Sequence, residues 1–140
     1  MEKRDYLLRQ IELMTQAFVS LIRRLLGLKE LNEEEVQQTT DEMLKEYLDI
    51  SVRKIMQMEF HELVELISKK QGIHKSNLDL LAEIIVLNAE SRQNTEEKTN
   101  LYRKALDLYE WIDKTGDTFS MERFRKMEEI RFLIAEEPED

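Results

Sequence analysis

Apolar residues recur every three or four positions along most of this chain, which is the spacing of one face of an α-helix. The pattern is densest between Asn77 and Gly116, where it predicts two consecutive helices with a short polar break at Arg92–Asn94. The first of them, Leu78 to Ala89, carries nine apolar residues in twelve positions. A helix that is apolar on nearly every side must be covered from several directions, so we expect it at the centre of the fold.

Apolar stripes of the same spacing predict the other helices, which we expect to pack around this central pair. The second helix of the central pair is predicted over Thr95–Thr115, and the predicted ranges of the others are Lys3–Leu26, Glu33–Leu48, Val52–Gln57, Phe60–Lys70 and Met121–Ala135. In the last of these helices the residues predicted to point inward are Phe124, Met127, Ile130 and Ile134.

Residues suited to helix ends stand at the predicted boundaries. A short polar side chain before the first turn accepts a hydrogen bond from a free backbone N–H, and a glycine after the last turn closes many helices. The predicted N-caps are Asn32, Ser51, Ser76, Asn94 and Ser120. The glycines predicted to end helices are Gly27, in the left-handed conformation, Gly72 and Gly116.

The first predicted helix is apolar over about half of its circumference, more than the roughly 100° that a surface helix needs against one core. Its main stripe runs from Leu7 to Leu28, and a second row widens it. Two arrangements satisfy this pattern: a homodimer through the N-terminal helix, or coverage of the whole arc by two other helices of the same chain. The residues of the second row are Leu8, Val19, Ile22 and Leu26.

The composition favours a single all-α domain. The chain has 140 residues, enough to bury a core, but only three glycines and one proline. No alternating strand pattern stands beside an Asn-Gly or Asp-Gly turn. We therefore predict a compact array of about six or seven antiparallel helices over residues 1–135, followed by a frayed acidic tail at 136–140.

The charge of the chain argues against nucleic acid as a partner. The formal net charge is −9, although residues 1–29 hold six cations and three anions. We interpret the basic first helix as complementing an acidic body within the chain. Cysteine is absent, and no apolar run fits a signal peptide or a membrane-spanning helix. These features predict a cytoplasmic protein without a membrane-spanning helix, and peripheral membrane attachment through the basic first helix is the least favoured of the alternatives.

One stretch carries a resemblance to a known family. Tyr102-Arg-Lys-Ala105-Leu-Asp-Leu108-Tyr109 is similar to the second helix of a tetratricopeptide (TPR) repeat, in which an aromatic residue and a later alanine let two helices approach closely. In that register Ala82 and Ile85 stand at core positions of the first helix, whereas Val86 and Lys98 replace small residues of the family. The resemblance covers one repeat-like unit, and it implies a TPR-like helix pair in the second half of the chain.

The chain as a whole also resembles a group of small all-helical bacterial proteins of unknown function. The similarity rests on Tyr6-Leu-Leu-Arg9-Gln-Ile11, on Leu25-Leu-Gly27-Leu-Lys29 and on the TPR-like second half. It supports the predicted fold and implies no particular chemistry.

We find no catalytic or metal-binding motif. His61-Glu-Leu-Val-Glu65 differs from the His-Glu-x-x-His zinc motif because a carboxylate replaces the second imidazole, and His74 lies thirteen residues further on. Runs of glutamate stand at predicted helix starts or on polar faces, where they favour the helix dipole and solubility. Phosphate-binding loops and nucleophile elbows are absent. The sequence thus predicts no catalytic residue, cofactor or metal.

The remaining class of function is binding. We expect a non-enzymatic, TPR-like protein–protein interaction module that self-associates through its first helix. Trp111 lies off the inward stripe of its helix, so it is either covered by the last helix or exposed as an anchor for a partner. The alternative is a protein that binds a small ligand or lipid in an apolar cavity lined by methionine and aromatic residues.

Overall fold

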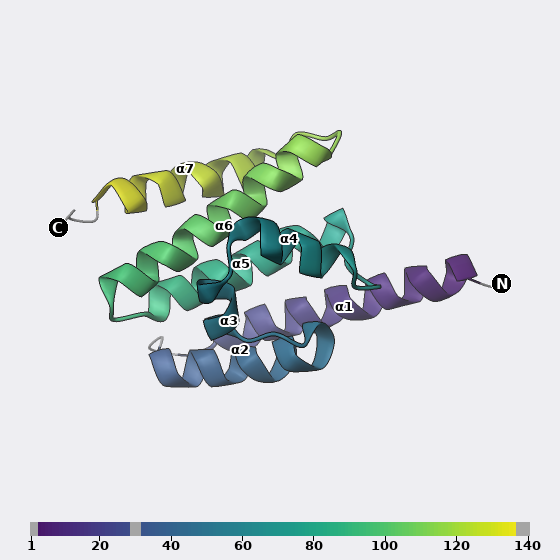
Figure 1. Ribbon diagram of the computed structural model, residues 1–140, viewed down its shortest axis with the longest axis horizontal. Helices are drawn as coiled ribbons and strands as arrows, with labels where there is room; N and C mark the ends of the chain where they lie inside the picture. Colours follow the sequence, from purple (N-terminus) through teal and green to yellow (C-terminus); the bar gives the residue numbers. More distant parts are fainter. Residues whose placement is uncertain (1–2, 29–31, 137–140) are drawn as a thin grey trace.

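The computed structural model describes residues 3–28 and 32–136 of the chain, and within them the backbone forms seven α-helices and no strand (Figure 1). The all-α prediction is confirmed. The four-residue end of the predicted acidic tail, 137–140, lies outside the described residues. The helices are α1 (Lys3–Leu26), α2 (Glu33–Leu48), α3 (Val52–Gln57), α4 (Phe60–Ser68), α5 (Lys75–Ser91), α6 (Thr95–Thr115) and α7 (Met121–Glu136).

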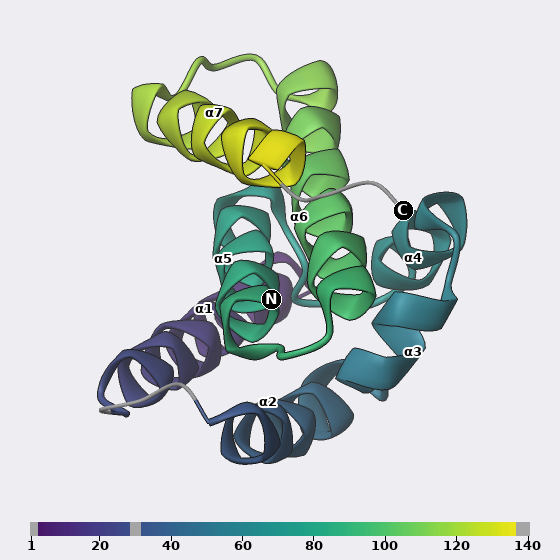
Figure 2. The ribbon, with the colours of Figure 1, turned by 90° about the vertical axis from the view of Figure 1, so that its left-hand side faces the viewer.

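Helices α5 and α6 form the antiparallel pair around which the other helices are arranged. They share the most extensive contact in the molecule, and α5 also packs against α1 and α2. Figure 2 shows α5 between α1 and α6. Ten residues of α5 are buried, as its apolar sequence predicts. The expected polar break between the two helices is present, since α5 ends at Ser91 and α6 begins at Thr95.

Helices α2, α3 and α4 form an outer arc around this pair (Figure 2). Helix α2 contacts α1 and α5, and α3 contacts α6. On the other side of the molecule α7 packs along α6 and ends the array (Figure 1). The central pair is therefore covered by α1 and by the arc of α2, α3 and α4, and α7 packs on the other side of α6.

Most predicted helix ends are confirmed, because caps depend on a few neighbouring residues. The side chains of Asn32, Ser51 and Asn94 accept backbone N–H groups at the starts of α2, α3 and α6, and Ser120 does so for α7. The start of α5 was predicted wrongly. His74 is its N-cap rather than Ser76, and the helix begins at Lys75, earlier than predicted.

Two predictions about glycines need correction. Helix α1 ends before Gly27 as expected, but positive φ angles in the described residues occur only at Asp49 and Gly72. Gly27 therefore does not adopt the left-handed conformation. Helix α4 ends at Ser68, two residues earlier than predicted. Gly72 has a φ of 94°, and a Cβ there would lie 3.1 Å from the carbonyl oxygen of Gln10 on α1. The loop thus needs glycine both for its backbone and for its approach to α1.

The apolar stripes point inward with two exceptions. In α1 the residues from Met14 to Leu25 of the main stripe are buried, but Leu7, the first exception, is exposed because the helix extends past the body (Figure 1). The surplus row on the flank of α1 also differs from its prediction, because Ile22 lies in the core with 7% exposed.

The second exception is in α7. Phe124 is 46% exposed, whereas Arg123 takes the inward position with 8% exposed. The prediction that Phe124 points inward is wrong.

Candidate functional site

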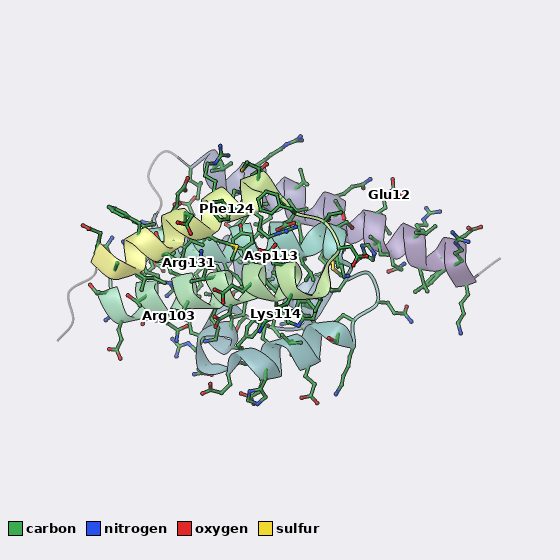
Figure 3. The ribbon with its side chains drawn as sticks, turned by 90° about the horizontal axis from the view of Figure 1, so that it is seen from above. Glu12, Arg103, Asp113, Lys114, Phe124 and Arg131 are labelled. Atoms are coloured by element: carbon green, nitrogen blue, oxygen red, sulfur yellow. The ribbon has the colours of Figure 1, made fainter. Side chains whose placement is uncertain are left out.

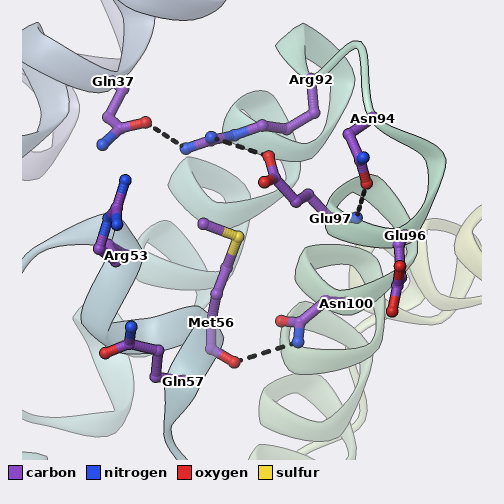
Figure 4. A pocket seen from close by; sticks show the side chains of 9 residues that line it. All are labelled: Gln37, Arg53, Met56, Gln57, Arg92, Asn94, Glu96, Glu97 and Asn100. Carbon is purple, nitrogen blue, oxygen red and sulfur yellow. Dashed lines mark hydrogen bonds and ion pairs between the residues drawn. The ribbon is translucent and has the colours of Figure 1, made fainter.

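A polar pocket of about 400 Å³ lies between α2, α3 and the turn that joins α5 to α6 (Figure 4). Small-molecule sites of this size are lined mainly by apolar and aromatic side chains. This pocket is lined instead by amides, guanidinium groups and carboxylates, and Met56 is its one apolar residue. The lining residues are Gln37, Arg53, Met56, Gln57, Arg92, Asn94, Glu96, Glu97 and Asn100.

Arg92 is the buried cation at the back of this pocket. Its side chain is 4% exposed, and its Nη2 donates to Oε1 of Gln37 over 2.6 Å. Its Nη1 lies 3.2 Å from Oε1 of Glu97 and 3.7 Å from a carboxylate oxygen of Glu33. The charge of Arg92 is therefore compensated within the chain. The residue joins α2 to the start of α6.

The other wall of the pocket is fixed by hydrogen bonds to the end of α3. The carbonyl oxygen of Met56 accepts from Nδ2 of Asn100 at 3.1 Å and from Nζ of Lys104 at 3.4 Å. These donors satisfy a carbonyl that the short helix α3 leaves without an intrahelical partner. Burial lowers the pKa of Lys104. The polar side chains on both walls thus hold α2, α3 and α6 together.

The pocket offers little catalytic chemistry. Its nine lining residues include no histidine, serine, cysteine or tyrosine, so they provide no pairing of a nucleophile with a base. Glu97 is engaged with Arg92. The arrangement fits a structural junction with a solvent-accessible mouth, at which Arg53 and Glu96 are exposed.

A smaller pocket of about 140 Å³ separates α7 from α5. Here Arg123 forms two hydrogen bonds to Asp79, of 2.8 and 3.1 Å, and one of 2.6 Å to Asp113. Nζ of Lys126 donates to Glu83 at 2.8 Å. These pairs fasten α7 to α5 and to the end of α6. The charged groups of this pocket are therefore used within the chain.

The Tyr109 hydroxyl is buried beside these pairs and has no hydrogen-bond partner in the described structure. Its pKa is raised, first by burial and then by the carboxylates of Glu83 and Asp79. The residue is therefore a neutral phenol at physiological pH. A phenol of this kind can donate a hydrogen bond but cannot act as a base.

The core holds a small enclosed cavity of about 10 Å³ beside Asn88. Nδ2 of Asn88 donates to the Thr40 hydroxyl at 3.0 Å and to the Ile84 carbonyl at 2.9 Å, whereas its Oδ1 has no partner. A cavity of this size has room for one water molecule. It is too small for a lipid or a small organic ligand.

Large apolar side chains are exposed on the outer side of α7 and on the loop before it. Figure 3 looks down onto this helix, on which Phe124 is labelled. The exposed fractions are 71% at Phe119, 70% at Met121, 46% at Phe124 and 64% at Phe132. The rings of Phe119 and Phe124 are in contact, with centroids 6.1 Å apart. We call these four residues the α7 face.

A second apolar surface lies on the first three turns of α1. We call Lys3–Leu13 the α1 arm. Nine of its eleven residues are exposed, and Figures 1 and 3 both show it extending past the other helices. Its exposed apolar residues are Tyr6 at 55%, Leu7 at 38%, Leu8 at 55% and Leu13 at 44%.

The residues predicted as contacts from the sequence are only partly on this surface. Leu8 lies on the α1 arm, and Leu26 is 62% exposed at the other end of α1. Val19 is half-buried, and Ile22 belongs to the core. Trp111 is half-buried and packs against the core, so it is neither fully covered nor a free anchor.

The α7 face was missed in the sequence. Its residues carry a signal, because Met121, Phe124 and Phe132 fall within a third of a turn of one another on a helical wheel at 100° per residue. That stripe was overlooked because Phe124 also fits the inward stripe of Met127, Ile130 and Ile134. Two apolar stripes on one short helix leave the inward side ambiguous.

The two histidines have separate, local surroundings. His61 is exposed on α4. Nδ1 of His74 accepts from the Ser76 backbone N–H at 3.1 Å, and Asn77 completes a capping box at the start of α5.

Within residues 3–28 and 32–136, no three histidine or carboxylate side chains are grouped so that they could hold a metal ion. Nor does any helix in those ranges combine the length and apolar character needed to cross a membrane.

Comparison with known proteins finds no matching family model, no matching curated protein and no matching solved structure. The class that the structure defines is therefore an all-helical protein, with seven helices in the described residues. Any function must be argued from its own surfaces.

Proposed function

We propose that this chain is a non-enzymatic, TPR-like protein-interaction module, which docks an amphipathic helix of a partner on the α7 face. The observation that carries the proposal is the exposure of Phe119, Met121, Phe124 and Phe132 at the end of the helical array. The rings of Phe119 and Phe124 are in contact, and exposed apolar side chains gathered on one side of a helix are typical of an interaction surface. A terminal helix of a stacked array normally has a polar outer face.

The expected occupant of the α7 face is a helix. Helix α7 already packs along α6 through buried residues of its inner side, such as Met127 and Ile130. A further helix laid on its outer side would continue the same layered packing. Recognition of an amphipathic helix through apolar residues spaced three and four apart is a common mode of peptide binding.

The TPR-like part of the proposal is supported by the contact between α5 and α6. Tyr102 is 4% exposed and Ala105 is completely buried, and both lie on the helix that packs most extensively against α5. Ala82 and Ile85 are buried on α5. Small and aromatic residues at these positions suit the close approach of two helices, as in a repeat unit. A cytoplasmic location remains part of the proposal, on the absence of cysteine.

The alternative of a lipid- or ligand-binding protein has weaker support. The cavity beside Asn88 holds about 10 Å³, and the pocket at Arg92 is polar. A groove of about 620 Å³ along α2 is lined by charged and amide side chains only, from Glu33 to Lys45. A lipid or drug-sized ligand requires about 300 Å³ or more of mainly apolar space.

The proposal is tested by affinity purification from the native organism with three baits. They are the wild type, the double variant Phe124→Glu with Phe132→Glu, and the control Leu26→Glu, which places the same charge on an exposed apolar residue of α1. We expect proteins retained by the wild type and by the control to be lost from the double variant, because buried unpaired carboxylates oppose docking. Identical sets from all three baits would contradict a role for the α7 face.

A further inference from the structure

We propose that the helix docked on the α7 face is the α1 arm of a second copy of this chain. This inference rests on the proposed function and names the partner of the same site. The molecule leaves two helical surfaces uncovered, and they lie on different elements, the first three turns of α1 and the outer side of α7. One contact between copies covers both surfaces at once.

The arm is short enough to lie within the exposed stripe of α7. Its exposed apolar residues extend over seven residue steps, from Tyr6 to Leu13, and those of the α7 stripe over eleven, from Met121 to Phe132. At 1.5 Å per residue these distances are about 10 and about 16 Å. An arm laid along α7 therefore stays within the length of the stripe.

The exposed charges also match. On the α1 arm three cations, Lys3, Arg4 and Arg9, outnumber two carboxylates. The exposed charged groups of α7 are four carboxylates and two arginines, Arg125 and Arg131. Two of the carboxylates are already paired within α7, Glu122 with Lys126 and Glu128 with Arg131. This leaves Glu129 and Glu136 against Arg125. The exposed side of α7 is therefore acidic, and a basic arm on this side is favoured at encounter.

Pairing each surface with its own copy is less favourable. In an antiparallel pairing of two α7 helices centred between Phe124 and Phe132, Glu128 faces Glu128 of the second copy, since it lies four residues from each phenylalanine. Two paired α1 arms bring six cations against four carboxylates. Like charges placed opposite each other destabilise a contact. The arm-to-face contact avoids this repulsion.

Each copy carries one arm and one face, so two copies that exchange arms form a closed dimer with two identical contacts. The leucines of the arm, Leu7 and Leu8, then pack against Phe124 and Phe132 of the second copy. When every copy carries the same variant, disruption of the arm or of the face abolishes both contacts of the dimer. A mixture of the two variants, however, retains one intact arm and one intact face that can still meet.

Light scattering at tens of micromolar tests this arrangement with an arm variant (Leu7→Glu, Leu8→Glu), a face variant (Phe124→Glu, Phe132→Glu) and the control Leu26→Glu. We expect twice the chain mass of 16.8 kDa for the wild type, for this control and for a second control, Gln38→Glu on the exposed side of α2, and a monomer for each double variant alone. Loss of the dimer in Leu26→Glu would instead place the contact on the flank of α1 and contradict the arm-to-face arrangement. An equimolar mixture of the two double variants should recover dimers. Circular dichroism checks folding, and Leu8→Gln and Phe132→Gln repeat the test without added charge.

Two further results would overturn the inference. A monomeric wild type would show that the arm and the face do not meet, although capture of a different helix by the α7 face would still stand. A dimer that persists in either double variant alone, beside a dimeric wild type, would show that the surface left intact in that variant pairs with its own copy.

Discussion

Leu25→Ala is expected to lower the free energy of unfolding by about 2–5 kcal/mol, whereas Leu26→Ala, one residue away, should change it by less than about 0.5 kcal/mol. The two leucines are chemically identical and adjacent, but Leu25 is completely buried and Leu26 is 62% exposed. Truncation of Leu25 removes apolar contacts and leaves a cavity in the core. Truncation of Leu26 removes a side chain that is already in water. Urea denaturation monitored by circular dichroism measures both changes.

Similar losses from the two variants would contradict the orientation of α1 that places Leu25 in the core and Leu26 in solvent. The comparison is sensitive because adjacent helical residues point about 100° apart, so a misplaced helix would exchange or equalise the two effects. Measurement at two protein concentrations separates folding within the chain from association, since only association makes stability depend on concentration.

Ile85→Ala is expected to cost about 2–5 kcal/mol as well, and Ile85→Val about 0.5–1.5 kcal/mol. Ile85 is 2% exposed on α5 and lines the small cavity beside Asn88, so truncation enlarges a void that already exists. Valine keeps most of the contacts and serves as the matched control. The difference in the free energy of unfolding between the two variants follows from their urea midpoints, if the dependence of that free energy on urea has the same slope in both.

A loss below about 1 kcal/mol for Ile85→Ala would contradict the central position of α5. A substitution of Glu83, two residues away on the same helix, would not serve as a neutral control, because Glu83 forms a 2.8 Å ion pair with Lys126 on α7. Its replacement would report on the attachment of α7 and not only on the surface of α5.

The central helix pair could be predicted from the sequence because its signals are local. Nine apolar residues in twelve leave α5 only a narrow polar side, at Asp79, Glu83 and Glu90, so most of the helix must be covered whatever the surrounding topology. The N-caps at Asn32, Ser51 and Asn94 depend on hydrogen bonds to backbone groups three residues away, which a short window of sequence contains.

The orientation of α7 could not be predicted in this way. The helix has two apolar stripes, and the inward one is selected by Arg123, whose partner Asp79 lies 44 residues earlier. A helical wheel contains no information about such a partner. The same reason explains Ile22, since its burial depends on which helices pack against the flank of α1.

The polar pocket at Arg92 was likewise invisible in the sequence. Its principal hydrogen bond joins Gln37 to Arg92 across 55 residues, and the wall formed by Met56 and Asn100 spans 44. These residues lie in three helices and one turn, and none of them belongs to a recognisable motif. Only the packing of α2 and α3 against the central pair brings them together.

The most direct test of the α7 face is site-specific photo-cross-linking in the native organism, with benzoylphenylalanine in place of Phe132 or, as a control, of Gln38 on the exposed side of α2. The probe at 132 replaces one aromatic ring by another and reacts only with a group in contact with it. We predict a discrete cross-linked product from position 132, which is absent from position 38 and lost when Phe124→Glu is added. No product from position 132, or the same product from both positions, would contradict the docking of a helix on this face.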